Sequence, residues 1–263
     1  MSETRPLFVP VILGTTRKGR MSAHAARFVL GELSRRKGVE TELIDIQEVP
    51  FPIDDAGEEA RDAGFAERMN RADGLVLVVP EYNHSFPGLF KHVLDTCLAE
   101  YIHKPAGIVG VSAGPFGGSR VVQSLLPALR EVGLVATFTD VNFGRVYDVF
   151  EEGSGALRDT AFSRRTADFL DDFLWMAKAL RHGREQIPAE EEGAQEPAAQ
   201  GREPMTCPSC GEAMNPHASK LVSPTSAEQA ARADPELGGL TLEAHACPTC
   251  GVGASRPAGA GGG

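Results

Sequence analysis

The sequence predicts an α/β fold, a doubly wound parallel sheet of five strands, followed by a small metal-bound ribbon. Three observations predict it. Five short apolar segments alternate with about five segments of helical periodicity, which is typical of consecutive βαβ units. The composition then becomes acidic and rich in Ala, Pro and Gln. Beyond that stretch, four cysteines form two C-x-x-C pairs, which predict a metal site in a separate small unit.

The first unit of the alternation begins with residues 7–13 (LFVPVIL), which are apolar enough for a strand buried in a parallel sheet. Pro10 has no backbone N–H, so we expect an irregular or edge-like position there. Apolar side chains then recur at helical spacing from Ser22 to Arg36, with Ser22 as the candidate N-cap. Residues 39–46 alternate between apolar and polar side chains and predict the second strand.

The middle of the chain repeats the pattern with two strongly apolar strands. A Pro- and Gly-rich connection is expected over 48–64, followed by a short helix at 65–73. Residues 74–80 (GLVLVVP) and 106–112 (AGIVGVS) are uninterrupted apolar runs, as in strands covered on both faces. The segment between these two strands predicts a helix over 87–98.

The last elements of the sheet are less regular. Residues 119–132 predict a helix that Pro127 kinks. The fifth strand is expected at 133–137, resuming near Val146, and 157–183 has the spacing of a long amphipathic helix. In a doubly wound sheet, ligands bind at the carboxyl ends of the strands, so the loops that follow the strands are the candidate sites.

Charge and composition narrow the classes of partner. The formal net charge is −10 and the pI is about 5.2, which disfavours binding to nucleic acid or to an anionic membrane. The first ten residues, MSETRPLFVP, lack the pattern of a signal peptide. No stretch approaches the ~18 apolar residues of a membrane-spanning helix. We therefore expect a cytoplasmic protein with no membrane or nucleic-acid partner.

The loop after the first predicted strand, GTTRKGRMS, has the glycine spacing of a P-loop at Gly14 and Gly19. Arg20 stands where a P-loop has Lys, and Met21 stands where it has Ser or Thr. A triphosphate site needs both missing groups. A single phosphate needs only unpaired amides at a helix N-terminus and hydroxyl or guanidinium donors. The loop therefore predicts a monophosphate site, with a solvated Thr- and Arg-rich turn as the alternative.

A second stretch, PEYNHSFPGLFKHVLD, follows the third predicted strand. Together with GTTRKGRMS it resembles the NADPH-dependent FMN reductase family, over about residues 7–182. Two residues depart from the family pattern: Thr15 replaces Ser, which keeps the hydroxyl, and Phe90 replaces Leu, which keeps an apolar side chain. The resemblance implies a flavodoxin-like fold, FMN as cofactor and NADPH or NADH as co-substrate.

The resemblance also implies which residues hold FMN. Those expected around the phosphate are Thr15, Thr16, Arg17, Arg20, Met21 and Ser22. Those expected along the isoalloxazine ring, through backbone amides and the Asn side chain, are Pro80, Glu81, Tyr82 and Asn83. Those expected at the pyrimidine edge lie in the loop VSAGPFGGSR and are Ser112, Ala113, Gly114 and Gly117. No catalytic side chain is expected, not even the nearby His84, because the flavin itself takes the hydride.

These features predict an FMN-dependent NAD(P)H oxidoreductase that reduces a small-molecule electron acceptor: a quinone, azo compound, free flavin or metal ion. The alternative is an FMN electron-transfer protein with a rubredoxin-like or partner-docking metal module. A third hypothesis is an interaction protein whose ribbon binds protein or nucleic acid; the acidic composition counts against nucleic acid. The resemblance further implies a homodimer or homotetramer with the 87–98 helix at the interface. Lys91 and Asp95 on that helix are also typical of a solvated surface pair.

The C-terminal cysteines predict a metal centre. The motifs CPSCG and CPTCG each put two thiolates on one turn, and the expected ligands are Cys207, Cys210, Cys247 and Cys250. Zinc is favoured over iron, because rubredoxin-like iron sites have an aromatic core and residues 205–263 contain no Phe, Tyr or Trp. The remaining cysteine, Cys97, lies on an apolar helical stretch and is expected in the core.

Four segments are therefore expected along the chain. They are a flavodoxin-like domain at 1–183, an acidic Pro- and Ala-rich linker at 184–204, the four-cysteine ribbon at 205–253 and a disordered tail at 254–263. Because the linker lacks apolar periodicity, the two folded parts are expected to be independent.

Overall fold

The computed structural model describes residues 5–54, 56–187, 204–231, 233, 238–250 and 252–257. The chain divides into two compact units, Met1–Glu191 and Glu192–Gly263. Most of the expected linker, residues 188–203, lies outside the described residues. In the described part, no helix is both long and apolar enough to cross a membrane.

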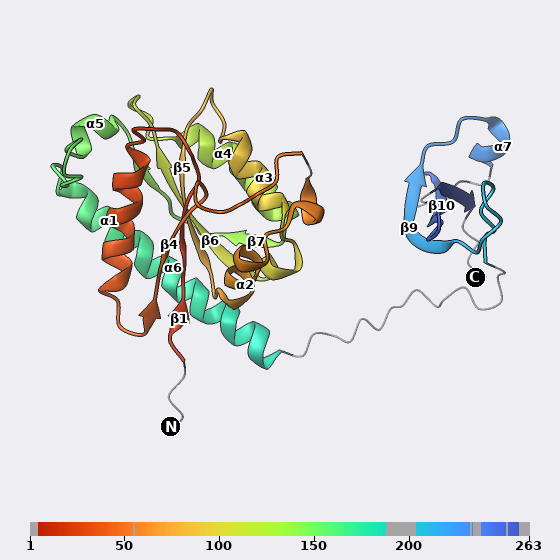
Figure 1. Cartoon of the computed structure of the whole chain (residues 1–263), viewed down its shortest axis with the longest axis horizontal. Helices are drawn as coiled ribbons and strands as arrows, with labels where there is room; N and C mark the ends of the chain where they lie inside the picture. Colours follow the sequence, from red (N-terminus) through yellow and green to blue (C-terminus); the bar gives the residue numbers. More distant parts are fainter. Residues whose placement is uncertain are drawn as a thin grey trace. The chain divides into compact units, whose positions relative to one another are not determined.

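The first unit is built on a parallel sheet (Figure 1). Its strands, in spatial order, are β4 (Leu43–Asp45), β2 (Val11–Leu13), β5 (Leu75–Pro80), β6 (Lys104–Val111) and β7 (Leu134–Ala136). Each pairs in parallel with its neighbours. Counted over the five expected strands, this is the order 2-1-3-4-5 of a flavodoxin-like sheet, so the predicted fold class is confirmed.

The first two expected strands are each split in two. β1 (Leu7–Phe8) and β3 (Val39–Glu40) pair in parallel ahead of β2 and β4. The break in the first strand falls at Pro10, where the sequence predicts an irregular position. Alternate residues of a strand donate to the same side, and the Phe8 N–H on that side donates to Asp73 Oδ2 at 3.0 Å. Pro10 has no N–H for the equivalent bond, so the ladder is interrupted there.

The fifth strand is also interrupted. β7 pairs with the beginning of β6, and β8 (Val141–Phe143) pairs with its end. The prediction that this strand resumes near Val146 is wrong, because Val146–Val149 is a short helix, α5. Arg145, which precedes it, is in the left-handed conformation (φ 48°), and such a backbone cannot continue a strand.

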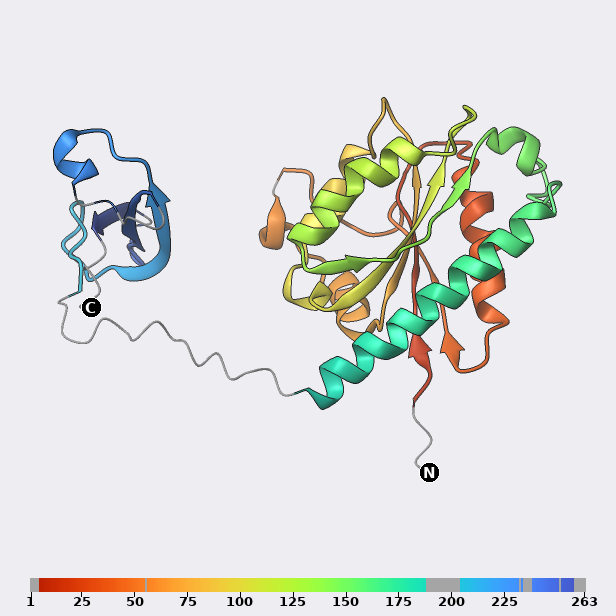
Figure 2. The same cartoon turned by 180° about the vertical axis from the view of Figure 1, so that it is seen from behind.

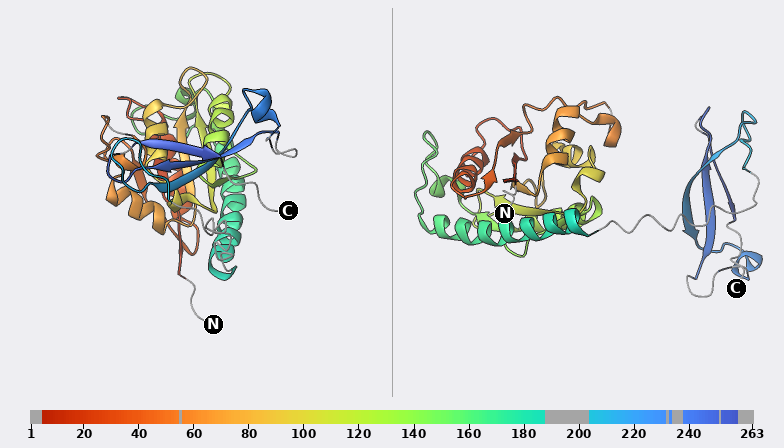
Figure 3. Two further views of the ribbon diagram at one scale, coloured as in Figure 1. Left: turned by 90° about the vertical axis from the view of Figure 1, so that its right-hand side faces the viewer. Right: turned by 90° about the horizontal axis from the view of Figure 1, so that it is seen from below.

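Helices cover both faces of the sheet (Figure 2). On one face lie α1 (Ser22–Ser34) and α6 (Ala161–Gln186); on the other lie α2 (Ala63–Arg71), α3 (Gly88–Asp95) and α4 (Ser119–Glu131). Two 3-10 turns, Gly57–Ala60 and Ala99–Tyr101, join these elements. The 26-residue helix α6 runs the length of the first unit (Figure 3). It extends three residues beyond the domain boundary expected at 183.

Alternate side chains of each strand enter two separate cores. In β5, Val76 and Val78 pack with α1 and α6, whereas Leu75 and Leu77 pack with α2, α3 and α4. Cys97 is fully buried in the second of these cores, as expected. Burial there raises the pKa of its thiol to about 11, so Cys97 is an inert thiol.

The second unit contains a three-stranded antiparallel sheet. Its order is β11 (Gly253–Pro257), β10 (Leu240–Ala246) and β9 (Asn215–Val222), and the insert between β9 and β10 holds the short helix α7 (Ala227–Ala230). The disordered tail expected from residue 254 is wrong for residues 254–257, because their backbone pairs with β10. Residues 258–263 lie outside the described part.

Candidate functional site

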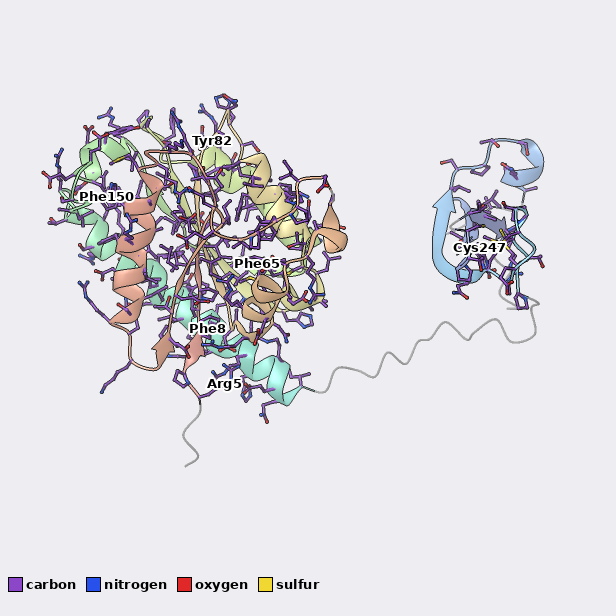
Figure 4. All side chains as sticks on the ribbon, in the orientation of Figure 1. Arg5, Phe8, Phe65, Tyr82, Phe150 and Cys247 are labelled. Atoms are coloured by element: carbon purple, nitrogen blue, oxygen red, sulfur yellow. The ribbon has the colours of Figure 1, made fainter. Side chains whose placement is uncertain are left out.

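A hollow of about 550 Å³ opens where β2 and β5 end. Figure 4 shows Tyr82 at this end of the first unit and Arg5 at the opposite end. Two segments far apart in the sequence line the hollow: Thr15, Thr16 and Arg17 from one, and Glu81, Tyr82, Asn83, Pro87, Gly88 and Leu89 from the other. Because β2 and β5 are neighbours in the sheet, the loops that follow them meet at its carboxyl edge.

The first loop leaves β2 in close contact with α3. A Cβ added to Gly14 would lie 3.0 Å from the ring of Phe90, so a larger residue would displace the ring or the loop. Thr15 is buried, and its Oγ1 lies 2.8 Å from the hydroxyl of Tyr82. Arg17 is exposed on the wall of the hollow. Its guanidinium forms no ion pair with any residue that the structure describes, so it is available to an anion.

The next three residues of this loop are not on the wall of the hollow. Arg20 forms an ion pair with Asp45 of β4. Met21 is 5% exposed, and its side chain belongs to the core beneath α1. Ser22 is the first residue of α1 rather than its N-cap, and its buried hydroxyl has no hydrogen-bond partner within the described ranges. An unpaired hydroxyl at a helix N-terminus is a donor that an anion can use.

The second loop is a tight turn. The backbone N–H and C=O of Tyr82 and Ser85 pair in both directions, at 2.8 and 2.9 Å. The two residues between them, Asn83 (φ 49°) and His84 (φ 67°), are both left-handed, as a two-residue hairpin turn requires. This turn holds the side chain of Asn83 at the hollow, while His84 does not line it.

Two backbone amides expected to contact a flavin ring are already bonded within the protein. The N–H of Glu81 donates to Val111 O at 2.8 Å, and the N–H of Tyr82 donates to Ser85 O. The Glu81 carboxylate accepts from Arg120 through Oε1 at 3.3 Å, while its buried Oε2 has no partner in the described part of the chain. A buried carboxylate oxygen without a donor is a candidate acceptor for a ligand N–H.

The third expected loop lies beside the hollow rather than on its wall. Ser112 Oγ donates to Gly114 O at 2.9 Å, which holds the loop to itself. A Cβ added to Gly117 would lie 2.7 Å from Asn142, so packing alone requires glycine there. Ala113 is exposed. The loop is connected to the hollow by Arg120, whose role in pairing with Glu81 the sequence did not reveal.

Pro87, Gly88 and Leu89 also line the hollow, although the sequence did not single them out as site residues. They belong to the PEYNHSFPGL stretch, so the motif that located Tyr82 was the available signal. Pro87 immediately precedes α3, and its position at the start of that helix fits its fixed φ.

The second unit brings all four expected cysteines together. Their sulfur atoms lie within 4.8 Å of one another, with Cys207–Cys250 and Cys210–Cys247 at 3.5 Å and Cys210–Cys250 at 3.6 Å. A tetrahedral zinc–thiolate centre with Zn–S bonds of about 2.3 Å requires S···S distances of roughly 3.8 Å. The spacing therefore fits a four-sulfur metal site, and no disulfide joins these cysteines.

The two turns around this cluster are built alike. Chiefly through the backbone N–H of Cys210, the pKa of the Cys207 thiol is lowered to about 6, and the backbone N–H of Cys250 likewise lowers the pKa of Cys247. Cys207 and Cys247 are buried with Met214 in the small core of this unit, where Figure 4 marks Cys247. The neighbouring sulfurs raise the pKa of Cys210 and Cys250, so two of the four cysteines are favoured as thiolates, the form that binds metal.

The similarity of this chain to known proteins lies in its first unit. The model of the family described as NADPH-dependent FMN reductase matches residues 9–148, more than half of the 263-residue chain. An NADPH azoreductase of Bacillus sp. (strain OY1-2) is 31% identical over 127 residues, which is 46% of this chain and 68% of that protein. An FMN-dependent NADPH-azoreductase of Staphylococcus aureus (strain USA300) is 28% identical over 180 residues, 62% of this chain and 92% of that protein.

Solved structures share the fold. FerB, a flavoenzyme NAD(P)H:(acceptor) oxidoreductase from Paracoccus denitrificans, has a TM-score of 0.55 and 24% identity, covering 66% of this chain and 98% of that chain. An oxidoreductase from Corynebacterium diphtheriae has a TM-score of 0.52 and 19% identity, covering 67% of this chain and 99% of that chain. At these identities the two structures show the fold alone. The matched family segment contains both loops that line the hollow and ends before the four-cysteine cluster.

Proposed function

Because the chain belongs to the NADPH-dependent FMN reductase family, we propose that its first unit is an FMN-dependent NAD(P)H oxidoreductase. The observation that carries the proposal is the meeting of the Thr- and Arg-rich loop with the Tyr82–Ser85 turn at one hollow. Its relatives are oxidoreductases, and those named azoreductases use NADPH by name, which favours NADPH over NADH as the co-substrate.

The donors at the first loop suit a phosphate monoester. Among the described residues, Arg17 supplies a guanidinium that forms no ion pair, Thr16 an exposed hydroxyl and Ser22 a buried hydroxyl without a partner. The N–H groups of Ala23 and His24 donate to Arg20 O and Met21 O at 3.1 and 3.0 Å, so the start of α1 favours an anion chiefly through the helix dipole. Met21 contributes through its backbone alone, since its side chain is in the core. Arg20 acts from outside the hollow, with its charge shared by Asp45.

The other wall of the hollow suits a flat ring with polar edges. Tyr82 is fixed by Thr15, so its ring stands at the hollow in one position and excludes water there. Asn83 presents a side-chain amide, and the unpaired Glu81 Oε2 presents an acceptor. Ser112, Ala113, Gly114 and Gly117 remain proposed contacts at the rim. When bound, FMN accepts a hydride from the nicotinamide and passes electrons to the acceptor, which we propose is a quinone, azo compound, free flavin or metal ion.

Arg17→Ala tests the phosphate site. Loss of one charge-assisted contact should weaken FMN binding by about 1.5–3 kcal/mol, which is roughly 10- to 150-fold in Kd. The Kd is measured by quenching of FMN fluorescence on titration with apo-protein. Lys18→Ala is the matched control, because Lys18 is an exposed cation in the same loop that does not line the hollow. Its Kd should stay within about threefold of wild type.

Equal FMN affinity in Arg17→Ala and wild type would remove the loop from the cofactor site. Reduction is tested separately, by mixing the FMN-loaded full chain with NADPH or NADH in a stopped-flow instrument. The visible absorbance of the flavin should bleach without an added acceptor. If neither nicotinamide bleaches it at a rate useful for turnover, the chain is the alternative, an FMN electron-transfer protein whose cysteine cluster serves a redox partner.

We also propose that the four-cysteine cluster holds one structural zinc ion. The near-tetrahedral sulfur spacing supports a metal, and the lack of aromatic residues in 205–263 favours zinc over a rubredoxin-like iron. Metal analysis of the purified full chain by mass spectrometry should find about one zinc per chain. Cys210→Ser should lose it, whereas Cys97→Ser, in the core of the other unit, should retain it. One iron per chain with visible thiolate absorption would refute zinc.

A homodimer or homotetramer also remains a proposal. Lys91 and Asp95 pair with each other along α3, and this contact is equally suited to a solvated face, so it does not itself indicate an interface. Light scattering on the eluted full chain measures the mass directly, and a monomer of 28.0 kDa would refute the proposal. The cytoplasmic location stays a prediction from the sequence.

A further inference from the structure

Phe116 is an exposed aromatic side chain in the loop between β6 and α4. Its side chain is 61% exposed, and it is one of two exposed phenylalanines among the described residues, the other being Phe138 at 91%. An exposed aromatic ring leaves apolar surface in contact with water. Near a candidate binding site, such a ring is a candidate contact for a ligand.

The loop holds Phe116 rigidly. The N–H of Ser119 donates to Phe116 O at 3.1 Å, and the N–H of Arg145 donates to Gly114 O at 2.8 Å. On the inner side, a Cβ added to Gly144 would lie 2.5 Å from Pro115 O, so the backbones of two loops are in direct contact. The exposed ring is therefore carried by a fixed backbone and not by a freely moving loop.

Two contacts connect the ring to the hollow. The guanidinium carbon of Arg120 lies 5.0 Å from the ring centroid of Phe116, and its Nη1 donates to Glu81 Oε1 at 3.3 Å. Glu81 lines the hollow. A third contact, between the hydroxyls of Ser85 and Ser124 at 3.3 Å, ties α4 to the Tyr82–Ser85 turn. Phe116 is not itself a lining residue, and it is connected to the hollow through Arg120, on the side of the third loop.

We propose that Phe116 is a specificity-determining residue that stacks on planar aromatic electron acceptors, with Arg120 as its positioning residue. The inference rests on the proposed reductase function and selects, among its acceptors, quinones and aromatic azo compounds over inorganic ions. A flat acceptor entering the hollow covers the exposed ring, which gains both apolar burial and ring–ring contact. A hydrated or complexed metal ion gains neither.

The test compares two acceptors on the FMN-loaded full chain. 1,4-Naphthoquinone is the planar probe: with NADPH and a proton it becomes the hydroquinone, and NADPH becomes NADP⁺. Ferricyanide is the inorganic probe. Phe116→Ala should lower kcat/KM for naphthoquinone about 5- to 20-fold, the range expected for loss of one stacked ring. Its kcat/KM for ferricyanide and its rate of flavin bleaching by NADPH should stay within about twofold of wild type.

Phe138→Ala is the matched control. It removes an even more exposed ring, and the neighbouring Thr137 N–H bonds to Ala106 O near the start of β6, far along that strand from the hollow. Its acceptor preference should equal that of wild type. Arg120→Lys keeps a cation beside Glu81 but loses the flat guanidinium over the ring. It should raise KM for naphthoquinone with kcat and the ferricyanide kinetics unchanged.

Each possible result of these experiments either supports the inference or overturns it. If Phe116→Ala reduces naphthoquinone as wild type does, or loses both acceptors equally, the inference is overturned. A change in the mass of the protein in light scattering with an unchanged ratio of the two acceptors also overturns it, because Phe116 is then an interface residue. If NADPH fails to bleach the wild-type flavin, the proposed function fails first and the inference with it. That failure is visible before any acceptor is added.

Discussion

Replacing Asp73 with Asn removes a buried negative charge that three arginines share. The Asp73 side chain is 1% exposed, and Arg5 donates to its two oxygens at 2.7 and 2.9 Å. Arg181 and Arg184 of α6 approach the same carboxylate to 3.5 and 3.3 Å. The N–H of Phe8 in β1 also donates to this carboxylate, at 3.0 Å from Oδ2. This one side chain therefore ties the N-terminal strand and the last helix to the beginning of β5.

The expected loss of unfolding free energy depends on how deeply Asp73 and its arginine partners are buried. Removing one partner of a buried ion pair costs about 3–5 kcal/mol. Arg5 is 54% exposed, so water screens its share, but Arg181 and Arg184 are only 13% and 20% exposed. Asn retains an acceptor for the Phe8 N–H, so we expect the lower end of the range, about 3 kcal/mol. For a unit of this size, that corresponds to a fall in Tm of roughly 6–12 °C.

The assay is thermal unfolding of the full chain, followed by the helical circular dichroism signal. The matched control is Asp171→Asn, because Asp171 pairs with Arg36 on the surface of α6 and is 64% exposed. Its loss should change stability by about 0.5 kcal/mol or less. If Asp73→Asn lies within about 1 kcal/mol of wild type while the control behaves as expected, the arginines do not depend on this carboxylate and the reasoning is refuted.

Two further predictions concern the same unit. A chain ending after Ile187 should fold and bind FMN. A chain ending after Gly183 should be less stable by about 1–3 kcal/mol, because it loses the hydrogen bonds of Arg184 to His103 O (2.6 Å) and to Asp73 (3.3 Å). Equal Tm values for the two chains would contradict this. Between pH 9 and 11, wild type should lose about 2 kcal/mol more unfolding free energy than Cys97→Ala in urea titrations. The folded state raises the pKa of this thiol from 9.0 to about 11, so the unfolded chain releases its proton first and unfolding is favoured as pH rises; parallel losses in both chains would contradict this sign.

The fold class and the position of the hollow could be predicted because their signals are local. Strands covered on both faces need apolar side chains throughout, so 74–80 and 106–112 are identifiable without knowing their neighbours. Strand direction follows from the alternation of strands and helices, and it places the loop with Arg17 and the turn with Tyr82 at the same edge.

The roles of single residues in these loops could not be predicted, because they depend on partners from other elements. Arg17 and Arg20 are the same residue type in one loop, yet Arg17 lines the hollow and Arg20 is paired with Asp45 of β4. Gly117 lies in a glycine-rich loop of the kind that binds ligands, but Asn142 already occupies the space where a Cβ at position 117 would lie. Spacing along the sequence carries no information about either partner.

The two walls of the hollow are held together by contacts inside the protein. The Thr15–Tyr82 bond of 2.8 Å joins its two walls. The turn beside it holds Asn83 and His84 in the left-handed region, at a cost on the order of 1 kcal/mol each, offset by the paired backbone bonds of the residues on either side. The conformational entropy lost in ordering this turn is therefore part of the free energy of folding. A ligand that enters does not meet this cost again, so its contacts with Arg17 and Asn83 appear more fully as affinity.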